Sequence, residues 1–210
     1  MKYIRTIALL NICFYVLTAF QCNSSESVKN EEKKKENSGN SNFNPYFPVK
    51  DGNTWTYINE TPREETELFT ITASEIRKVE GGIQVKLSSF PFLTKDNESR
   101  SITVMGSGAI EINNYMGNSG VIFPSENNFS KGHSWSFGIF NAKINSCVES
   151  VTTEDGEFTD CCYAMMTDGF TFSFEMWFKK DIGIVKWGAN RTNPPILRAV
   201  YYVLKEHKLN

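Results

Sequence analysis

The sequence predicts an all-β fold, with a single antiparallel domain that is a strongly bent, barrel-like sheet or a sandwich. Three observations lead to this prediction. Many short runs alternate between apolar and polar residues with a period of two, the pattern of a half-buried strand. Turn residues such as Gly and Asp separate these runs at intervals of about 8–12 residues. From residue 45 onward, no run keeps the 3.6-residue period of an amphipathic helix.

The first segment, residues 1–21, is typical of a secretory signal peptide. Lys2 and Arg5 supply its positive charge, and an apolar run from Ile7 to Phe20 follows them. A membrane-spanning helix needs roughly 20 predominantly apolar residues. Because this run is shorter, the sequence favours an export signal over a permanent membrane span.

Cys22 follows the signal directly, and LTAFQC resembles the lipobox of bacterial lipoproteins in the relaxed form seen in spirochaetes. The resemblance implies lipidation of Cys22, with a diacylglyceryl group on its thiol and an acyl chain such as palmitate on the new N-terminus. Such chains hold a protein firmly at a membrane. Asn23 stands where Asp commonly retains lipoproteins in the inner membrane, which implies sorting to the outer membrane. The alternative is a soluble secreted protein cut nearby, since Gln21 replaces the usual small residue.

Residues 22–44 read as the lipidated cysteine and a disordered tether. After Cys22 the segment contains one Val and one Phe, which is too little apolar surface to offset the entropy lost on ordering. A flexible coil of about 20 residues reaches about 25 Å on average. Its EEKKKE cluster carries both signs of charge, which indicates a solvated spacer and not a polybasic lipid-binding patch.

The β-domain is predicted over residues 45–210. Strand-like runs follow one another along it, and turn signals lie between several of them. The expected strands are Trp55–Asn59, Leu68–Ile76, Ile83–Phe90, Ser101–Met105, Ala109–Asn113, Ser134–Phe140, Ser146–Thr152, Phe158–Met166, Phe170–Lys179, Gly183–Trp187 and Leu197–Lys205. The expected turns are Gly81-Gly82, Gly106-Ser107-Gly108, Asp155-Gly156 and Asp168-Gly169. Asp-Gly between alternating runs is a strong signal for a two-residue hairpin turn.

The stretch YFPVKDGNTWTY, residues 46–57, is expected to start the fold. Pro48 does not fit inside a central strand, and Asp51-Gly52-Asn53 reads as a turn. Trp55 and Tyr57 then share one face of the first strand. They are expected to be core side chains, the alternative being a platform for a ligand.

Several segments together resemble a family of bacterial lipoproteins and secreted proteins whose folded part begins with a segment similar to YYPLKVGNSWTY. The matching segments are YFPVKDGNTWTY (46–57), FSKGHSWSF (129–137), VTTEDGEFTDC (151–161), FKKDIGIVKW (178–187) and YYVLKE (201–206). Near its end the family carries a GVGLVK-type segment. Asp51 and Asp155 replace residues that are apolar or small in the family. The resemblance implies an antiparallel β-domain of the cell envelope, and it implies no catalytic residues.

One apolar stripe is the clearest strand pattern in the chain. Within FTFSFEMWFK the side chains that share a face are Phe170, Phe172, Phe174, Met176 and Phe178. Burying each of them contributes roughly 1.5–3 kcal/mol, so this face is not left in water. The favoured interpretation is plain core, and the alternative is the lining of an apolar ligand cavity.

The cysteines beyond the lipidation site predict a disulfide. An exported protein lies in an oxidising compartment, where disulfides persist. With a turn at Asp155-Gly156, Cys147 lies opposite Ala164, and Cys162 is its diagonal neighbour on the same face. Cys161 points to the other face and is the second choice. A Cys147–Cys162 bridge then needs a bulge or a slight shift of register. The alternative is free or buried thiols.

Patterns for catalysis or cofactor binding are lacking in the sequence. His133 lies in a turn-like segment and His207 in a charged tail, neither beside a Ser or Cys with an orienting Asp. No Cys-x-x-Cys pair predicts a metal site, and no phosphate-binding or dinucleotide loop is present. Loss of Lys2 and Arg5 changes the formal net charge from −2 to −4, which argues against nucleic acid.

These observations predict a lipid-anchored protein of the cell envelope with a non-enzymatic binding or structural role and no cofactor. Its expected partner is the membrane, through the N-terminal lipid. Two classes of role stay open. One is a carrier of a lipid or another hydrophobic molecule behind the Phe stripe, and the other is an interaction module for envelope or host proteins. A hydrolase is the less favoured alternative.

Overall fold

The computed structural model describes residues 43–60, 67–91, 99–115, 117–191 and 198–210. The predicted signal peptide, Cys22 and the tether as far as residue 42 lie outside the described residues. Within the described ranges, the structure contains no helix with the length and hydrophobicity of a membrane span.

Most of the described residues lie in strands. In chain order these are β1 (Thr54–Asn59), β2 (Leu68–Val79), β3 (Gly82–Leu87), β4 (Arg100–Met105), β5 (Ile110–Tyr115), β6 (Asn118–Phe123), β7 (Ser134–Phe137), β8 (Phe140–Thr153), β9 (Gly156–Thr167), β10 (Phe172–Lys179), β11 (Gly183–Arg191) and β12 (Arg198–Lys208). A short 3-10 helix, η1 (Glu126–Asn128), lies between β6 and β7. The predicted all-β class is therefore confirmed.

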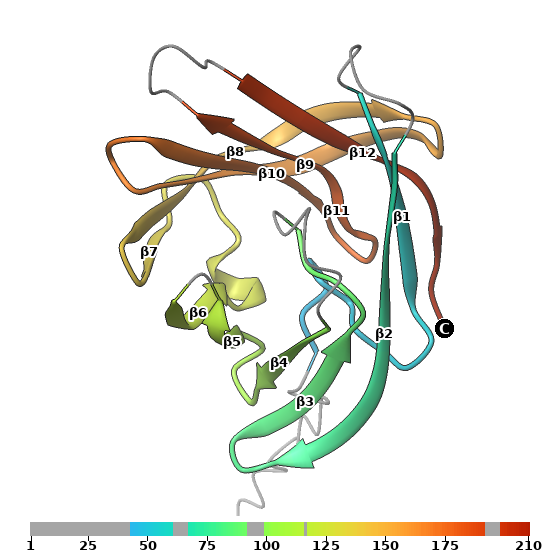
Figure 1. Cartoon of the computed structure of the whole chain (residues 1–210), viewed down its shortest axis with the longest axis vertical. Coiled ribbons are helices and arrows are strands. Elements are labelled where there is room, and N and C mark those ends of the chain that lie inside the picture. The colour runs from blue at the N-terminus through green and yellow to red at the C-terminus, as the bar shows by residue number, and fades with distance from the viewer. Residues whose placement is uncertain (1–42, 61–66, 92–98, 116, 192–197) are drawn as a thin grey trace, which may run out of the picture. The chain divides into compact units, whose positions relative to one another are not determined.

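The strands form one 12-stranded sheet in the order β6-β5-β4-β3-β2-β1-β12-β11-β10-β9-β8-β7. Each neighbouring pair in it is antiparallel. The sheet consists of two meanders, β1–β6 and β7–β12, which are joined where β1 pairs with β12. Figure 1 shows the sheet bending so that β8–β12 face β3–β6.

The two edge strands of the sheet approach each other. Trp135 of β7 donates its indole N–H to the backbone carbonyl of Ile122 in β6, with a nitrogen–oxygen distance of 3.1 Å. The sheet thus nearly closes into a barrel, which decides between the two architectures that the alternation left open. An edge that is covered in this way is protected from pairing with another chain.

Aromatic side chains fill the space inside the bent sheet. Phe178 of β10 packs edge-on against Phe123 of β6, with ring centroids 5.1 Å apart, although many strands separate β10 from β6 in the sheet order. Trp187 of β11 stacks on Tyr202 of β12 with centroids 4.3 Å apart. Small side chains lie on the same inner face, among them Ala73, Ala142 and Ala164, each at most 2% exposed. Alternation of large and small side chains lets the facing walls interlock.

The start of the fold is anchored by the predicted turn-and-strand stretch. Trp55 and Tyr57 are each 1% exposed, so both are core side chains. Their polar ends are satisfied across the sheet. The Trp55 indole donates to the carbonyl of Ile182 at 2.7 Å, and the Tyr57 hydroxyl donates to that of Ile184 at 2.9 Å. Burial raises the pKa of Tyr57, which keeps its hydroxyl a donor.

The domain begins slightly earlier than predicted. Asn44, which the composition assigns to the tether, is 1% exposed. Its side-chain amide donates to the carbonyls of Gly108 and Pro124, both at 2.9 Å. Phe47 then packs its ring between those of Trp55 and Phe123. Two buried hydrogen bonds explain why a polar residue belongs to the fold.

One predicted strand assignment is wrong, and one strand was not predicted. The run Ser134–Phe140 is two strands, β7 and β8, with a turn at Gly138 and Ile139. Gly138 has φ of 57°, and a side chain on it would meet Asn118 of the neighbouring edge, so only glycine fits there. The strand β6 was not predicted at all, because its Asn118-Ser119-Gly120 start reads as a turn.

The Asp168-Gly169 turn is built around a single carboxylate. Asp168 accepts hydrogen bonds from the backbone N–H groups of Phe170, Thr171 and Phe172 at 2.9–3.0 Å, and from the Thr171 hydroxyl at 2.9 Å. The backbone donors of Phe172 and Phe170 are the largest causes that lower the pKa of Asp168 below its ordinary value of 3.8. Only the ionised carboxylate accepts from so many donors at once.

Asp168 is therefore expected to make stability depend on pH at the acid end. A carboxyl whose pKa is lower in the folded than in the unfolded chain stabilises the fold above the unfolded value. That stability is lost as pH falls through the folded pKa. Asp168→Asn should lower the urea midpoint at pH 7, and the gap to wild type should shrink as pH falls below about 4. Urea unfolding followed by fluorescence at several pH values measures this, and parallel profiles would contradict the assigned role.

Candidate functional site

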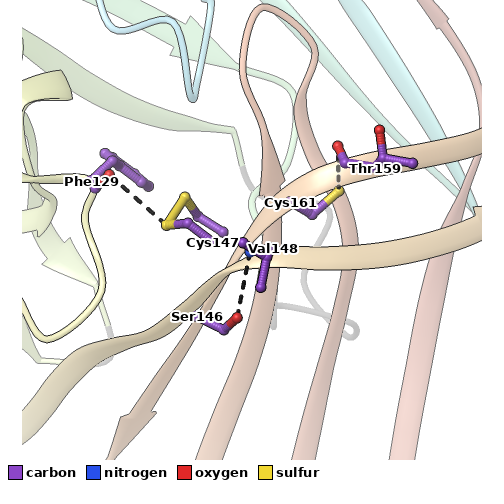
Figure 2. The surroundings of a disulfide bond; sticks show 7 residues. Phe129, Ser146, Cys147, Val148, Thr159 and Cys161 are labelled. Atoms are coloured by element: carbon purple, nitrogen blue, oxygen red, sulfur yellow. Dashed lines mark hydrogen bonds between the residues drawn. A yellow bond between two sulfur atoms is a disulfide. The ribbon is translucent and has the colours of Figure 1, made fainter.

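Cys147 and Cys162 are joined by a disulfide that links β8 to β9. The residues Ser146 and Tyr163 are paired on one side of it and Glu149 and Cys161 on the other, with a bulge in between. Figure 2 shows the bridge and the Cys147 sulfur directed toward the Phe129 carbonyl, at a distance of 3.9 Å. The bridge ties two neighbouring strands where their ladder is irregular, and it forms part of the scaffold.

The predicted position of the turn in this hairpin is wrong by one residue. The turn residues are Glu154 and Asp155, and Gly156 pairs with Thr153. Moving the turn by one position shifts the register by two, which brings Cys162 opposite Cys147 in place of Ala164. Gly156 has φ of 133°, a conformation that explains glycine just after the turn.

Cys161 is the free cysteine of the described residues, and it is fully buried on the other side of β9. Its thiol lies 3.4 Å from the Phe158 carbonyl and 3.9 Å from that of Thr159. Figure 2 shows its sulfur turned toward Thr159 and away from the bridge. Burial, more than any charge nearby, raises the pKa of Cys161 to about 11. A thiol that stays protonated at neutral pH is a weak nucleophile.

The predicted Phe stripe lies partly in the core. Phe174, Met176 and Phe178 are 4%, 0% and 0% exposed, and Phe172 is half-buried. Phe170 does not belong to this face, because the Asp168 turn extends to Thr171 and leaves Phe170 86% exposed. Side chains that line a cavity wide enough for an acyl chain would keep accessible surface. The three inner side chains of β10 instead touch other side chains.

The two histidines occupy structural positions. His133 stacks on Trp135 near the start of β7, with ring centroids 6.1 Å apart. His207 of β12 contacts the Asp155 carboxylate at the tip of the β8–β9 hairpin. Lys205 lies 3.9 Å from Glu154 of the same tip. These contacts hold the acidic tip against β12. Among the described residues, no group of acidic, His and Cys side chains has the geometry of a metal site.

A cluster of aromatic and polar side chains lies on the outer face of β9–β12. We call this the outer-face cluster, and its members are Tyr163, Glu175, Trp177, Lys186, Asn190 and Tyr201. All are half-buried. The pairing of the strands brings them together, because Trp177 lies opposite Tyr163 on one side and Lys186 on the other.

Tyr201 lies flat across the sheet in this cluster. A side chain on Gly188, its partner on β11, would lie 2.3 Å from the tyrosine ring, so glycine leaves the space that the ring fills. Trp177 is inclined by 60° to Tyr201, with centroids 6.3 Å apart. The ring of Tyr163 stacks on that of Trp177, with ring centroids 4.8 Å apart. The rings of Tyr201 and Trp177 therefore form a corner. Tyr201 lies along the sheet, and Trp177, with Tyr163 stacked on it, forms the wall of this corner.

Polar groups surround this aromatic corner. Glu175 accepts hydrogen bonds from the Tyr201 hydroxyl and from the Asn190 amide, each at 2.9 Å. The Lys186 ammonium lies 5.2 Å from the centre of the Tyr201 ring and 5.7 Å from that of Trp177, and it is paired with Glu60 at 2.8 Å. Burial, with Glu175 as a smaller cause, raises the pKa of Tyr163 to about 12. Burial also raises the pKa of Tyr201, so both phenols are donors at neutral pH.

The outer-face cluster was not predicted from the sequence. The available signal was Trp177, an aromatic residue among the polar side chains on the solvent face of its strand. Tyr163, Lys186 and Tyr201 come from other strands, and only the register of the sheet shows that they meet.

Comparison with known proteins gives no family and two partly similar structures. No protein-family model matches the chain, and no curated protein is similar to it. A predicted lipoprotein from Parabacteroides distasonis ATCC 8503 aligns with a TM-score of 0.46 at 16% identity, over 79% of this chain and 99% of that one. A predicted exported protein with a YmcC-like fold from Bacteroides fragilis NCTC 9343 aligns with a TM-score of 0.48 at 13% identity, over 78% and 98%. At these values neither a fold nor a function is transferred, and the family resemblance of the short segments stays a prediction.

Proposed function

We propose that this chain is an exported protein, anchored in the cell envelope through a lipid on Cys22, whose β-domain binds a partner on its outer surface and carries out no catalysis. The observation that carries this proposal is the contrast between the two faces of the sheet. The inner face packs aromatic side chains against one another, whereas the outer face of β9–β12 presents aromatic rings beside hydrogen-bonding groups.

The anchor rests on the sequence before the domain. The segment LTAFQC places a cysteine directly after an export signal, and Asn23 supports sorting to the outer membrane. The disulfide between Cys147 and Cys162 is consistent with an oxidising compartment outside the cytoplasm. A tether before Asn44 would give the domain freedom to reach a partner at some distance from the membrane.

A binding role is favoured over the two alternatives by the state of specific side chains. For a carrier, the inner side chains of β10 would have to line a space, yet Met176 and Phe178 are fully buried against neighbours. For a hydrolase, a nucleophile would need activation, yet the pKa of the Cys161 thiol is raised to about 11.

Cys22→Ala tests both parts of the proposal in one protein. The variant is expected in the soluble fraction of the exported material, because it lacks the thiol that carries the lipid. Its mass under native conditions should equal that of the bare polypeptide less about 2 Da for the two hydrogens lost in the disulfide. Cell fractionation followed by native mass spectrometry measures this.

Cys13→Ala is the matched control, since Cys13 lies in the predicted signal and should have no effect on anchoring. Retention at the membrane of Cys22→Ala chains that have lost residues 1–21, as their mass would show, would contradict the anchor. An additional mass of lipid size on the soluble variant would contradict the filled interior and support a carrier.

A further inference from the structure

We infer that the outer-face cluster is a binding site for a neutral glycan, with one pyranose ring stacked on Tyr201 against the wall formed by Trp177. This inference rests on the proposed function, because it names the partner of the binding surface. The site is formed by β9–β12, which are regular strands and hold their side chains in fixed positions.

The shape of the corner suits a sugar ring. A pyranose with equatorial hydroxyls carries its C–H bonds on two flat faces, and such a face packs on an aromatic ring. Tyr201 is held flat by its fit over Gly188 and by the hydrogen bond from its hydroxyl to Glu175. Trp177 is supported from behind by Tyr163, so the wall does not need to be ordered when a ligand binds.

The polar groups suit sugar hydroxyls, which both donate and accept hydrogen bonds. An ionised carboxylate has about four acceptor positions, and two contacts to Glu175 are accounted for by Tyr201 and Asn190. The Lys186 ammonium lies over the rings of Tyr201 and Trp177, so a pyranose that stacks on Tyr201 displaces it to the edge of the sugar ring. An ammonium has three donors, and the ion pair of Lys186 with Glu60 uses one of them. Hydrogen bonds to charged groups are the stronger ones, and they fix the orientation of a stacked ring.

The charge of the site argues for a neutral ligand. Lys186 brings one positive charge, while Glu60 and Glu175 bring two negative ones, so phosphate or another anion is repelled. A purely apolar peptide side chain would cover the Glu175 carboxylate without giving it new hydrogen bonds, which costs free energy. A neutral glycan supplies an apolar face and hydroxyl groups together, so it is the occupant to which the cluster is complementary.

Sugar titrations of the full chain, purified from membranes in a mild detergent, test this inference. The probes are cellohexaose and chitohexaose, both of which are built from pyranoses with equatorial hydroxyls or N-acetyl groups. At least one of them is expected to bind saturably, with a Kd of about 1 mM or lower. Calorimetry measures the affinity, and tryptophan fluorescence should change on binding because Trp177 lies in the site. Binding of chitohexaose alone would indicate a glycan with N-acetyl groups, and binding of cellohexaose alone one without them.

Three variants locate the site. Trp177→Ala should weaken binding at least tenfold, and Tyr201→Phe, which keeps the ring but loses the hydroxyl, should weaken it severalfold. Phe170→Ala removes an aromatic side chain that is exposed elsewhere and should leave the affinity unchanged. Urea midpoints of all three variants show that the fold is retained, and Tyr201→Phe covers the case that Trp177→Ala does not fold.

The outcomes separate this inference from the proposed function. If neither probe binds at about 10 mM, or if the variants bind as wild type does, the glycan site is overturned. The proposed function would then stand, with the partner bound elsewhere on the surface. A lipid bound inside the Cys22→Ala protein would overturn the proposed function, whatever the sugar titrations show.

Discussion

Phe178→Ala is expected to lower the free energy of unfolding by about 3–5 kcal/mol, the usual cost of removing a buried phenyl ring. Phe178 is 0% exposed and connects two opposite walls of the domain. Its ring lies 5.1 Å, centre to centre, from those of both Phe123 and Phe129. Within the sheet it is paired with Cys162 of β9 on one side and with Ile184 of β11 on the other. The neighbours are held by different segments of the chain and cannot all move inward, so much of the cavity should persist.

Phe170→Ala is the matched control, since it makes the same chemical change at an exposed position before β10. It should alter the free energy of unfolding by no more than about 0.5 kcal/mol. Urea unfolding of both variants, followed by tryptophan fluorescence, measures the difference. A loss below about 1 kcal/mol in Phe178→Ala would show that this face is loosely packed. It would then support the alternative interpretation, in which this face lines a ligand cavity.

The double variant Cys147→Ser, Cys162→Ser is expected to lose about 3 kcal/mol relative to the oxidised wild type. The two cysteines are 15 residues apart, and closing a loop of that size restricts the unfolded chain by about this amount. Urea unfolding with and without a reductant measures the loss. The wild type should become less stable when it is reduced, whereas the double variant should be insensitive to the reductant.

Cys161→Ala is the control for this experiment, because Cys161 is a buried free thiol and takes no part in the bridge. This variant should keep the full sensitivity to reductant. If reduction leaves the wild type as stable as before, the bridge does not contribute as proposed. If Cys161→Ala loses its sensitivity, the bridge is formed by a different pair.

The all-β class was predictable because period-two alternation and turn residues are local signals. Phe174, Met176 and Phe178 were assigned to one buried face on that basis, and they lie there. Phe170 continues the same alternation but is exposed, because the Asp168 carboxylate gathers the backbone N–H groups of residues 170–172 into a turn. Alternation does not show where a strand ends when a polar side chain organises the turn before it.

The β8–β9 hairpin shows how a small local error changes a distant pairing. Asp-Gly suggested a turn at residues 155 and 156, whereas the chain turns at Glu154 and Asp155. The Thr153 hydroxyl accepts a hydrogen bond from the Asp155 N–H, which favours the earlier turn. The register then differs by two residues, and the cysteine pair becomes directly opposed. Faces are preserved by such a shift, so the choice of Cys162 over Cys161 did not depend on it.

The outer-face cluster could not be predicted from the sequence, for a different reason. Its members are brought together by the pairing of four strands, and each pairing has its own register. Tyr201 reaches Glu175 only because Gly188, on the strand between them, has no side chain. A glycine inside a strand run indicates a close approach, but the sequence does not identify the group that approaches.

The pairing of β1 with β12 has a consequence for biogenesis. Each meander consists of hairpins between consecutive strands, and such local structure forms within microseconds. The two meanders join through strands from opposite ends of the domain. If the chain is exported as proposed, β1 would cross the membrane long before β12, so one of its edges would remain open until translocation of the domain ends. An open edge is prone to pairing with the wrong chain. The emerging protein would therefore depend on a chaperone, or on rapid translocation, over this interval.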